Sequence, residues 1–159
     1  MQHTINVRVK NEFGVLSRVS GLFSARGYNI DSLCVAETLD PTVSQITLVT
    51  QGDDETIEQI VKQLYKLIDV IKVSDHTSVA SFVGRELALF KVRTLPEARA
   101  EVMRIAEIFR GKIVDVTPDS YTIEVTGSPE KIRGLADLLR PLGLEDVVRT
   151  GRVAVARGG

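Results

Sequence analysis

Residues 5–10 alternate between apolar and polar side chains. Ile5, Val7 and Val9 are each separated by a polar or charged residue, and this period of two predicts a β-strand with one buried face. Apolar residues then recur at helical spacing, and Gly27 follows them in the position where many helices end. The apolar stripe of this predicted helix consists of Leu16, Val19, Leu22 and Phe23.

Further strands are predicted over residues 28–38 and 43–51, because both stretches are rich in residues that favour extended backbone. Asp53 and Asp54 begin a second predicted helix, 53–66, where acidic residues complement the helix dipole. A fourth strand begins at Val70 and ends near His76. The order β-α-β-β-α-β predicts a four-stranded antiparallel sheet with both helices on one face.

The same order recurs after residue 81. Strands are predicted over residues 87–92, 112–116, 121–126 and 147–155, and helices over 96–109 and 128–139, with Ser128 as an N-cap. The fold class is therefore α+β, with two ferredoxin-like modules in tandem, which we divide as residues 1–78 and 79–159. Sequence identity between the halves is weak, so this repeat depends on element order alone.

Composition excludes several function classes. The chain has 159 residues, 43% of them hydrophobic, and a formal net charge of −1, which argues against a nucleic-acid partner. No apolar run approaches the ~18–20 residues that span a bilayer, and the first residues lack the features of a signal peptide. Cys34 is the only cysteine, which fits a reducing compartment. We therefore expect a cytoplasmic protein without a membrane or nucleic-acid partner, and a structural Cys34 that is buried or half-buried.

The loop before the first helix is the main candidate site. Gly14 permits positive φ, and the amides of Val15 and Leu16 lie at a helix N-terminus, where free N–H groups and the helix dipole favour a carboxylate. Asn11 and Asn29 offer amide oxygens to an ammonium group. Apolar side chains such as Leu16 and Ile30 would enclose a short aliphatic tail. These features together describe a zwitterionic apolar amino acid, although on the local pattern alone a plain turn and helix cap is the better explanation.

Other candidate chemistry is weaker. His3 and His76 have no acidic or cysteine partners at metal-ligand spacing, so both are predicted to be surface histidines and no metal is expected. The chain has no G-x-G-x-x-G fingerprint and no Ser-His-Asp order. No residue set predicts catalysis.

The run N-E-F-G-V-L-S-R-V-S-G-L-F-S-A-R-G-Y-N-I-D-S-L, which begins at Asn11, resembles the small regulatory subunits of acetolactate synthase (acetohydroxyacid synthase). The similarity continues through D-P-T-V-S-Q-I-T-L-V-T, I-V-K-Q-L-Y-K-L-I-D-V, R-E-L-A-L-F-K-V and A-E-I-F-R-G-K-I-V-D-V-T. It therefore spans nearly the whole chain. The resemblance implies an amino-acid-sensing ACT domain over residues 4–78, and the family's C-terminal domain from about residue 83 onward.

The resemblance implies a non-catalytic partner of a large subunit that carries thiamine diphosphate, magnesium and FAD, none of which this chain would bind. The large subunit is a transferase that condenses two pyruvates to acetolactate, or pyruvate with 2-oxobutanoate, in branched-chain amino-acid biosynthesis. The small subunit raises its activity and confers feedback inhibition by valine. Family effector sites lie between two ACT domains of a homodimer.

By this resemblance, the family's effector loop corresponds to Asn11–Leu16. The neighbouring chain would contribute Asn29, with Ile30 beside it. We expect the large subunit to contact the predicted helix 53–66, with Gln59 and Gln63 as contact residues. The sequence leaves valine, leucine and isoleucine open as effectors, because one methylene in an apolar pocket discriminates by only ~1–3 kcal/mol.

Three alternatives have distinct signatures. A free-standing ACT-type regulator would bind valine without co-purifying with a large enzyme subunit. An RNA-binding protein of this topology would need exposed aromatic residues on its central strands, where Ile46 and Leu48 stand instead. An enzyme in its own right would turn over pyruvate alone.

Overall fold

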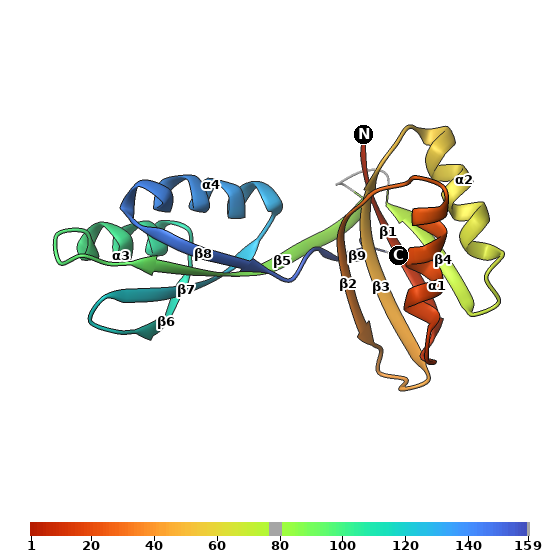
Figure 1. Cartoon of the computed structure of the whole chain (residues 1–159), viewed down its shortest axis with the longest axis horizontal. Helices are drawn as coiled ribbons and strands as arrows, with labels where there is room; N and C mark the ends of the chain where they lie inside the picture. Colours follow the sequence, from red (N-terminus) through yellow and green to blue (C-terminus); the bar gives the residue numbers. More distant parts are fainter. Residues whose placement is uncertain (77–80, 159) are drawn as a thin grey trace. The chain divides into compact units, whose positions relative to one another are not determined.

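In a computed structural model, which describes residues 1–76 and 81–158, the chain forms two compact units (Figure 1). The first unit comprises Met1–Val83 together with Arg152–Gly159, and the second comprises Gly84–Gly151. The domain boundary predicted between residues 78 and 79 lies outside the described residues. The C-terminal segment therefore returns to the first unit, which element order alone does not predict.

The first unit has the predicted order β-α-β-β-α-β. Its elements are β1 (Gln2–Lys10), α1 (Val15–Ala25), β2 (Ile30–Glu37), β3 (Val43–Gln51), α2 (Asp54–Tyr65) and β4 (Val70–His76). The strands lie in the order β2-β3-β1-β4, and antiparallel pairing sets Ile5 opposite Leu48. Both helices cover one face of this sheet (Figure 1).

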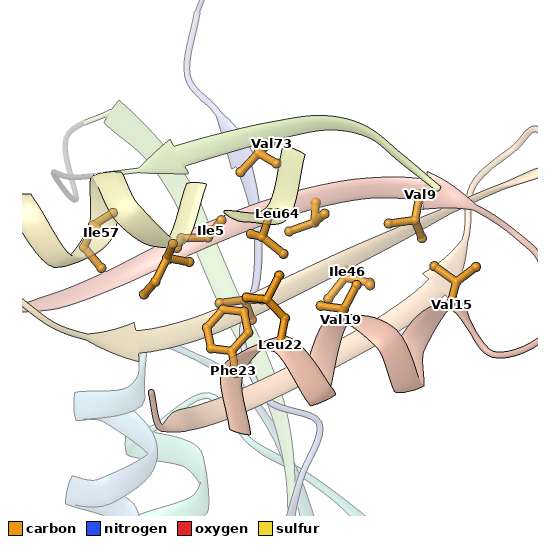
Figure 2. Packing of buried hydrophobic residues seen from close by; sticks show 13 residues of the cluster. Ile5, Val9, Val15, Val19, Leu22, Phe23, Ile46, Ile57, Leu64 and Val73 are labelled. Carbon is orange, nitrogen blue, oxygen red and sulfur yellow. The ribbon is translucent and has the colours of Figure 1, made fainter. Parts of the chain in front are cut away.

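The core of this unit lies between the sheet and its two helices (Figure 2). Apolar residues of β1 alternate into it, while α1 contributes a stripe that includes Val19 and Phe23. The Phe23 ring packs edge-on against Tyr28, with ring centroids 6.2 Å apart. Because β1 directs its apolar side chains to this core, its polar ones, such as Asn6 and Arg8, occupy the helix-free face of the sheet.

The second unit repeats the arrangement. Its elements are β5 (Phe82–Arg93), which begins in the first unit, α3 (Arg99–Ile108), β6 (Lys112–Val116), β7 (Ser120–Gly127), α4 (Pro129–Leu139), the 3₁₀ helix Arg140–Leu142 and β8 (Leu144–Arg149). The strand order β6-β7-β5-β8 matches β2-β3-β1-β4 position by position. The predicted fold class, two ferredoxin-like modules, is confirmed. The predicted cap is also present, because the Ser128 hydroxyl accepts from the Lys131 amide at 3.2 Å.

The single strand predicted over residues 147–155 is wrong. β8 ends at Arg149, the chain turns through Gly151 with φ 83°, and a separate strand β9 (Val153–Ala156) follows. β9 pairs with β5, and it is held against the sheet of the first unit by side chains of β1. Arg152 Nη1 donates to Thr4 Oγ1 at 2.7 Å, and Asn6 Nδ2 donates to the Ala154 carbonyl at 2.9 Å.

Candidate functional site

The loop between β1 and α1 has the geometry predicted for Gly14. This glycine caps α1 at φ 82°, in the left-handed region, without a side-chain hydrogen bond at the cap. The Val15 amide makes a long contact of 3.4 Å with the Glu12 carbonyl, whereas the amides of Leu16 and Ser17 have no acceptor among the described residues. The Val15 side chain is 3% exposed, so this residue offers the loop only its backbone. Leu16 is exposed.

Asn11 is fixed to the turn between β2 and β3. Its backbone amide donates to the Thr42 carbonyl at 2.8 Å, and its side-chain Nδ2 donates to the Pro41 carbonyl at 2.9 Å and to Glu37 Oε2 at 3.2 Å. Both amide protons are therefore used, while the side-chain oxygen has no donor among the described residues. Asn11 thus presents a positioned acceptor at the effector loop.

The neighbouring turn is itself ordered by Asp40. The hydroxyl of Thr42 donates to the Asp40 carboxylate at 2.7 Å and its amide donates at 3.0 Å. These two donors lower the pKa of Asp40 below its ordinary value. The carbonyls that hold Asn11 therefore belong to a well-bonded turn.

Arg18 is a site residue that the sequence analysis missed. Its Nε and Nη2 donate to Asp69 Oδ2 at 2.9 and 2.6 Å, and Asp69 is buried. A Cβ atom placed on Gly14 would lie 3.2 Å from Arg18 Nη1, so the guanidinium reaches back to the loop. Arg18 lies four residues after Gly14, and side chains at that spacing share a helix face with the preceding turn. The loop therefore combines free amides with a fixed cation, which favours a carboxylate.

Asn29 and Ile30 lie at the opposite end of β2. Asn29 is exposed, and its Nδ2 donates to Asp31 Oδ1 at 2.8 Å, which leaves its side-chain oxygen open. Ile30 packs partly against the core. The eight residues of β2 separate Asn29 from Asn11 by about 25 Å at the usual rise per residue. One protomer therefore brings Asn11, Gly14, Val15 and Leu16 together, but not Asn29 and Ile30.

The proposed contact residues lie elsewhere, on α2. Gln59 is exposed, and Gln63 is half-buried with its Oε1 accepting from Arg26 Nη2 at 2.7 Å. Cys34 is half-buried, as predicted.

The prediction of surface histidines is wrong. His3 is 1% exposed and His76 is 8% exposed. Pairing of β1 with β4 brings Asp75 to His3, with Nδ1 and Oδ1 3.2 Å apart, and the His76 ring lies 5.2 Å from that of Phe82. These partners are distant in sequence, so no local pattern reveals them.

Across residues 1–76 and 81–158, His, Cys, Asp and Glu side chains form no group of three that would hold a metal ion. In the same part of the chain, no helix has the length and apolar character to cross a membrane.

Comparison with known proteins places the chain in a family. The chain matches the family described as "Small subunit of acetolactate synthase" over residues 85–158, and the one described as "AHAS small subunit-like ACT domain" over residues 5–72. The acetolactate synthase small subunit of Aquifex aeolicus is 54% identical over 158 residues, which cover 98% of this chain and 81% of that protein. The isozyme 3 small subunit of Escherichia coli is 46% identical, with 99% and 97% covered.

A solved structure agrees with these matches. The crystal structure of the acetolactate synthase small subunit from Thermotoga maritima superimposes with a TM-score of 0.94 at 41% identity, covering 100% of this chain and 99% of that one. The chain belongs to the acetolactate synthase small-subunit family, and its first unit contains the family's ACT domain.

Proposed function

We propose that this chain is the regulatory subunit of a cytoplasmic acetolactate synthase, that it raises the activity of the catalytic subunit, and that it confers feedback inhibition by valine. Family membership supports the partnership with a catalytic subunit. Thiamine diphosphate, magnesium and FAD belong to that partner in this proposal. The observation that carries the effector assignment is the loop at Gly14, where unbonded amides, a cation and an open amide oxygen lie together.

Valine would be held by complementary charges. Its carboxylate accepts from the amides of Leu16 and Ser17 and lies near the Arg18 guanidinium, while its ammonium group donates to the open oxygen of Asn11. The exposed side chain of Leu16 is available to cover the isopropyl group. This half-site lacks a second acceptor on the opposite side of the ammonium group.

A second protomer supplies that acceptor in our proposal. β2 is an edge strand that pairs with β3 alone among the described strands. Two copies related by a two-fold axis pair such edges antiparallel, so the beginning of one β2 meets the end of the other. Glu37 ends β2 and accepts from Asn11. This pairing therefore carries Asn29 of the partner subunit to the effector loop, and it also removes the exposed edge.

Regulation then requires two states of the complex. Valine inhibits only if it binds the less active state more tightly than the active one, and couplings of this kind amount to about 1–3 kcal/mol, or roughly 5–150-fold in affinity. A binding site at the interface between two protomers is suited to such coupling, because a small change in how the two sheets pair alters both protomers at once.

Reconstitution tests the proposal. Acetolactate formation is measured for the catalytic subunit alone, after addition of this chain, and after addition of valine. We expect the chain to raise the rate and valine to reduce it again. A chain that binds valine but never alters the catalytic rate would instead be a free-standing regulator.

A further inference from the structure

A groove of about 400 Å³ lies on the helix-free face of the first unit. Its floor is formed by β1, β2, β3 and β4, and β9 lines its other side. The hydrogen bond from Asn6 Nδ2 to the Ala154 carbonyl, at 2.9 Å, joins floor and strand. The volume is at the small end of the range for ligand pockets, about 300–1,000 Å³.

Two cations lie side by side on the floor. Arg8 and Lys72 are directly opposite each other in the antiparallel pairing of β1 with β4, a position where like charges destabilise a sheet. Arg8 Nε donates to Gln45 Oε1 at 3.1 Å. Among the described residues, no carboxylate lies within 4 Å of either cation. The sheet therefore holds a repulsive pair that no acidic side chain of the described chain neutralises.

Two more polar side chains continue this floor. Ser74 lies on the same face of β4 as Lys72, and its hydroxyl has no partner among the described residues. His76 also lines the groove, and its Nε2 is buried without a hydrogen-bond partner. Glu37 stands at the end nearest the effector loop, where its carboxylate already accepts from Asn11. Arg8 and Lys72 thus give the groove two positive charges against the one negative charge of Glu37.

We propose that this groove binds a small ligand bearing an oxyanion, either a phosphate or a carboxylate group. The oxyanion lies between Arg8 and Lys72, where it relieves their repulsion, and it accepts from the Ser74 hydroxyl. Arginine suits this contact because its planar fork binds two oxygens at once. This site lies on the helix-free face of the sheet and is separate from the loop proposed for valine.

Calorimetric titration of the full chain tests this site. Sodium pyrophosphate probes for a phosphate ligand and sodium citrate for a carboxylate ligand, each compared with sodium chloride at equal ionic strength, because screening alone weakens charge repulsion. We expect saturable binding of at least one probe and none of chloride. Arg8→Gln and Lys72→Gln should each weaken binding about tenfold or more, since each removes a charged contact. Lys62→Gln, on the exposed side of α2, should bind as the wild type does.

Thermal unfolding of the same proteins separates lost binding from lost folding. Without added anion, Lys72→Gln should unfold at the wild-type temperature or above it, because one of two repelling charges is gone. The probe that binds should raise the midpoint of the wild type and of Lys62→Gln more than that of Lys72→Gln. The proposal is overturned if neither probe binds, or if Arg8→Gln and Lys72→Gln bind as tightly as Lys62→Gln.

Discussion

At the scale of single residues, Gly14 meets two requirements at one position. Its φ of 82° is rarely adopted by residues with a side chain, and the absence of a Cβ leaves room beside Arg18 Nη1. In our proposal both features serve the binding of a carboxylate, because the turn leaves amides of the first turn of α1 unbonded and the missing Cβ leaves space beside Arg18. The backbone conformation and the proposed binding chemistry therefore depend on the same residue.

Replacement of Gly14 by a charged residue should abolish valine sensitivity while leaving activation of the catalytic subunit intact. Gly14→Asp sets a carboxylate where that of valine would bind, and it adds a second carboxylate beside Arg18, which already pairs with Asp69. We expect the valine concentration for half-inhibition of the reconstituted enzyme to rise by more than about tenfold. Gly14→Asn is the matched control, because asparagine tolerates the left-handed region and carries no charge. Full valine inhibition of Gly14→Asp would show that the effector binds elsewhere.

The second unit also contains an ion pair with a buried carboxylate, between Glu86 and Arg149. Arg149 donates through Nε at 2.7 Å and Nη2 at 3.0 Å to the two oxygens of Glu86, which is 2% exposed. The hydrogen bonds to Glu86 raise the pKa of Arg149. Because Arg149 is itself half-exposed, the pair keeps one face in water.

Replacing one partner of this ion pair should lower the free energy of unfolding more than replacing both partners. Arg149→Met leaves a buried carboxylate unpaired, so we expect the free energy of unfolding to fall by about 3 kcal/mol in urea titrations. The double variant Glu86→Leu with Arg149→Met should recover most of this loss. A double variant that is less stable than Arg149→Met would contradict this account of the pair.

At the scale of elements, local patterns predicted the helices and most strands, because the spacing of apolar residues that defines a helix or a strand is visible within a short stretch of sequence. Gly27 ends α1 at φ 71°, and Ser128 caps α4, as predicted. The separate strand β9 and the burial of His3 depend on contacts between residues about 70 to 150 positions apart, which no window of sequence reveals. In the candidate site, the loop conformation was predictable, whereas the Arg18–Asp69 pair beside it was not.

The cap of α2 gives an element-scale prediction about pH. Asp53 accepts from the Thr56 amide at 2.8 Å, and this hydrogen bond lowers the pKa of Asp53. A lowered pKa in the folded state means that the cap stabilises the protein above the ordinary aspartate value of about 3.9 and is lost as pH falls through the folded value. Asp53→Ala should therefore lower the melting temperature near neutral pH, and the difference should shrink below about pH 4.

Asp53→Asn is the control for this prediction, since asparagine caps helices as well as aspartate does and does not titrate. Melting temperatures of the three proteins are compared across the pH range by circular dichroism. A difference between wild type and Asp53→Ala that stays constant as the pH falls would show that the charge of Asp53 plays no part.

At the scale of the whole molecule, the proposed function depends on surfaces that one chain leaves unused. In this proposal the two halves of the effector site meet across the edge strand β2, so valine binding would require a dimer. α2 is our candidate for contact with the catalytic subunit, through the exposed Gln59 and the half-buried Gln63. In this proposal, the effect of valine would be transmitted from the interface between the two β2 strands through α1 to α2. The hydrogen bond from Arg26, which follows α1, to Gln63 of α2 links the two helices.

Substitutions on α2 test the contact with the catalytic subunit. Gln59→Ala combined with Gln63→Ala should raise the concentration of this chain needed for half-maximal activation by about tenfold, as expected when interface contacts worth about 1.4 kcal/mol are lost. Ser24→Ala, on the exposed side of α1, should change nothing. Unaltered activation by the double variant would place the contact on another surface.

The most direct test of a shared effector site uses mixed dimers of Gly14→Asp and Asn29→Ala chains, with acetolactate formation measured with and without valine. Each variant alone damages both sites of its homodimer, so both should resist inhibition. A mixed dimer keeps one intact site, formed by the unaltered Gly14 of one chain and the unaltered Asn29 of the other, so mixing should restore part of the valine inhibition. If the mixture stays as insensitive as either variant alone, the site does not span two protomers and the account is wrong.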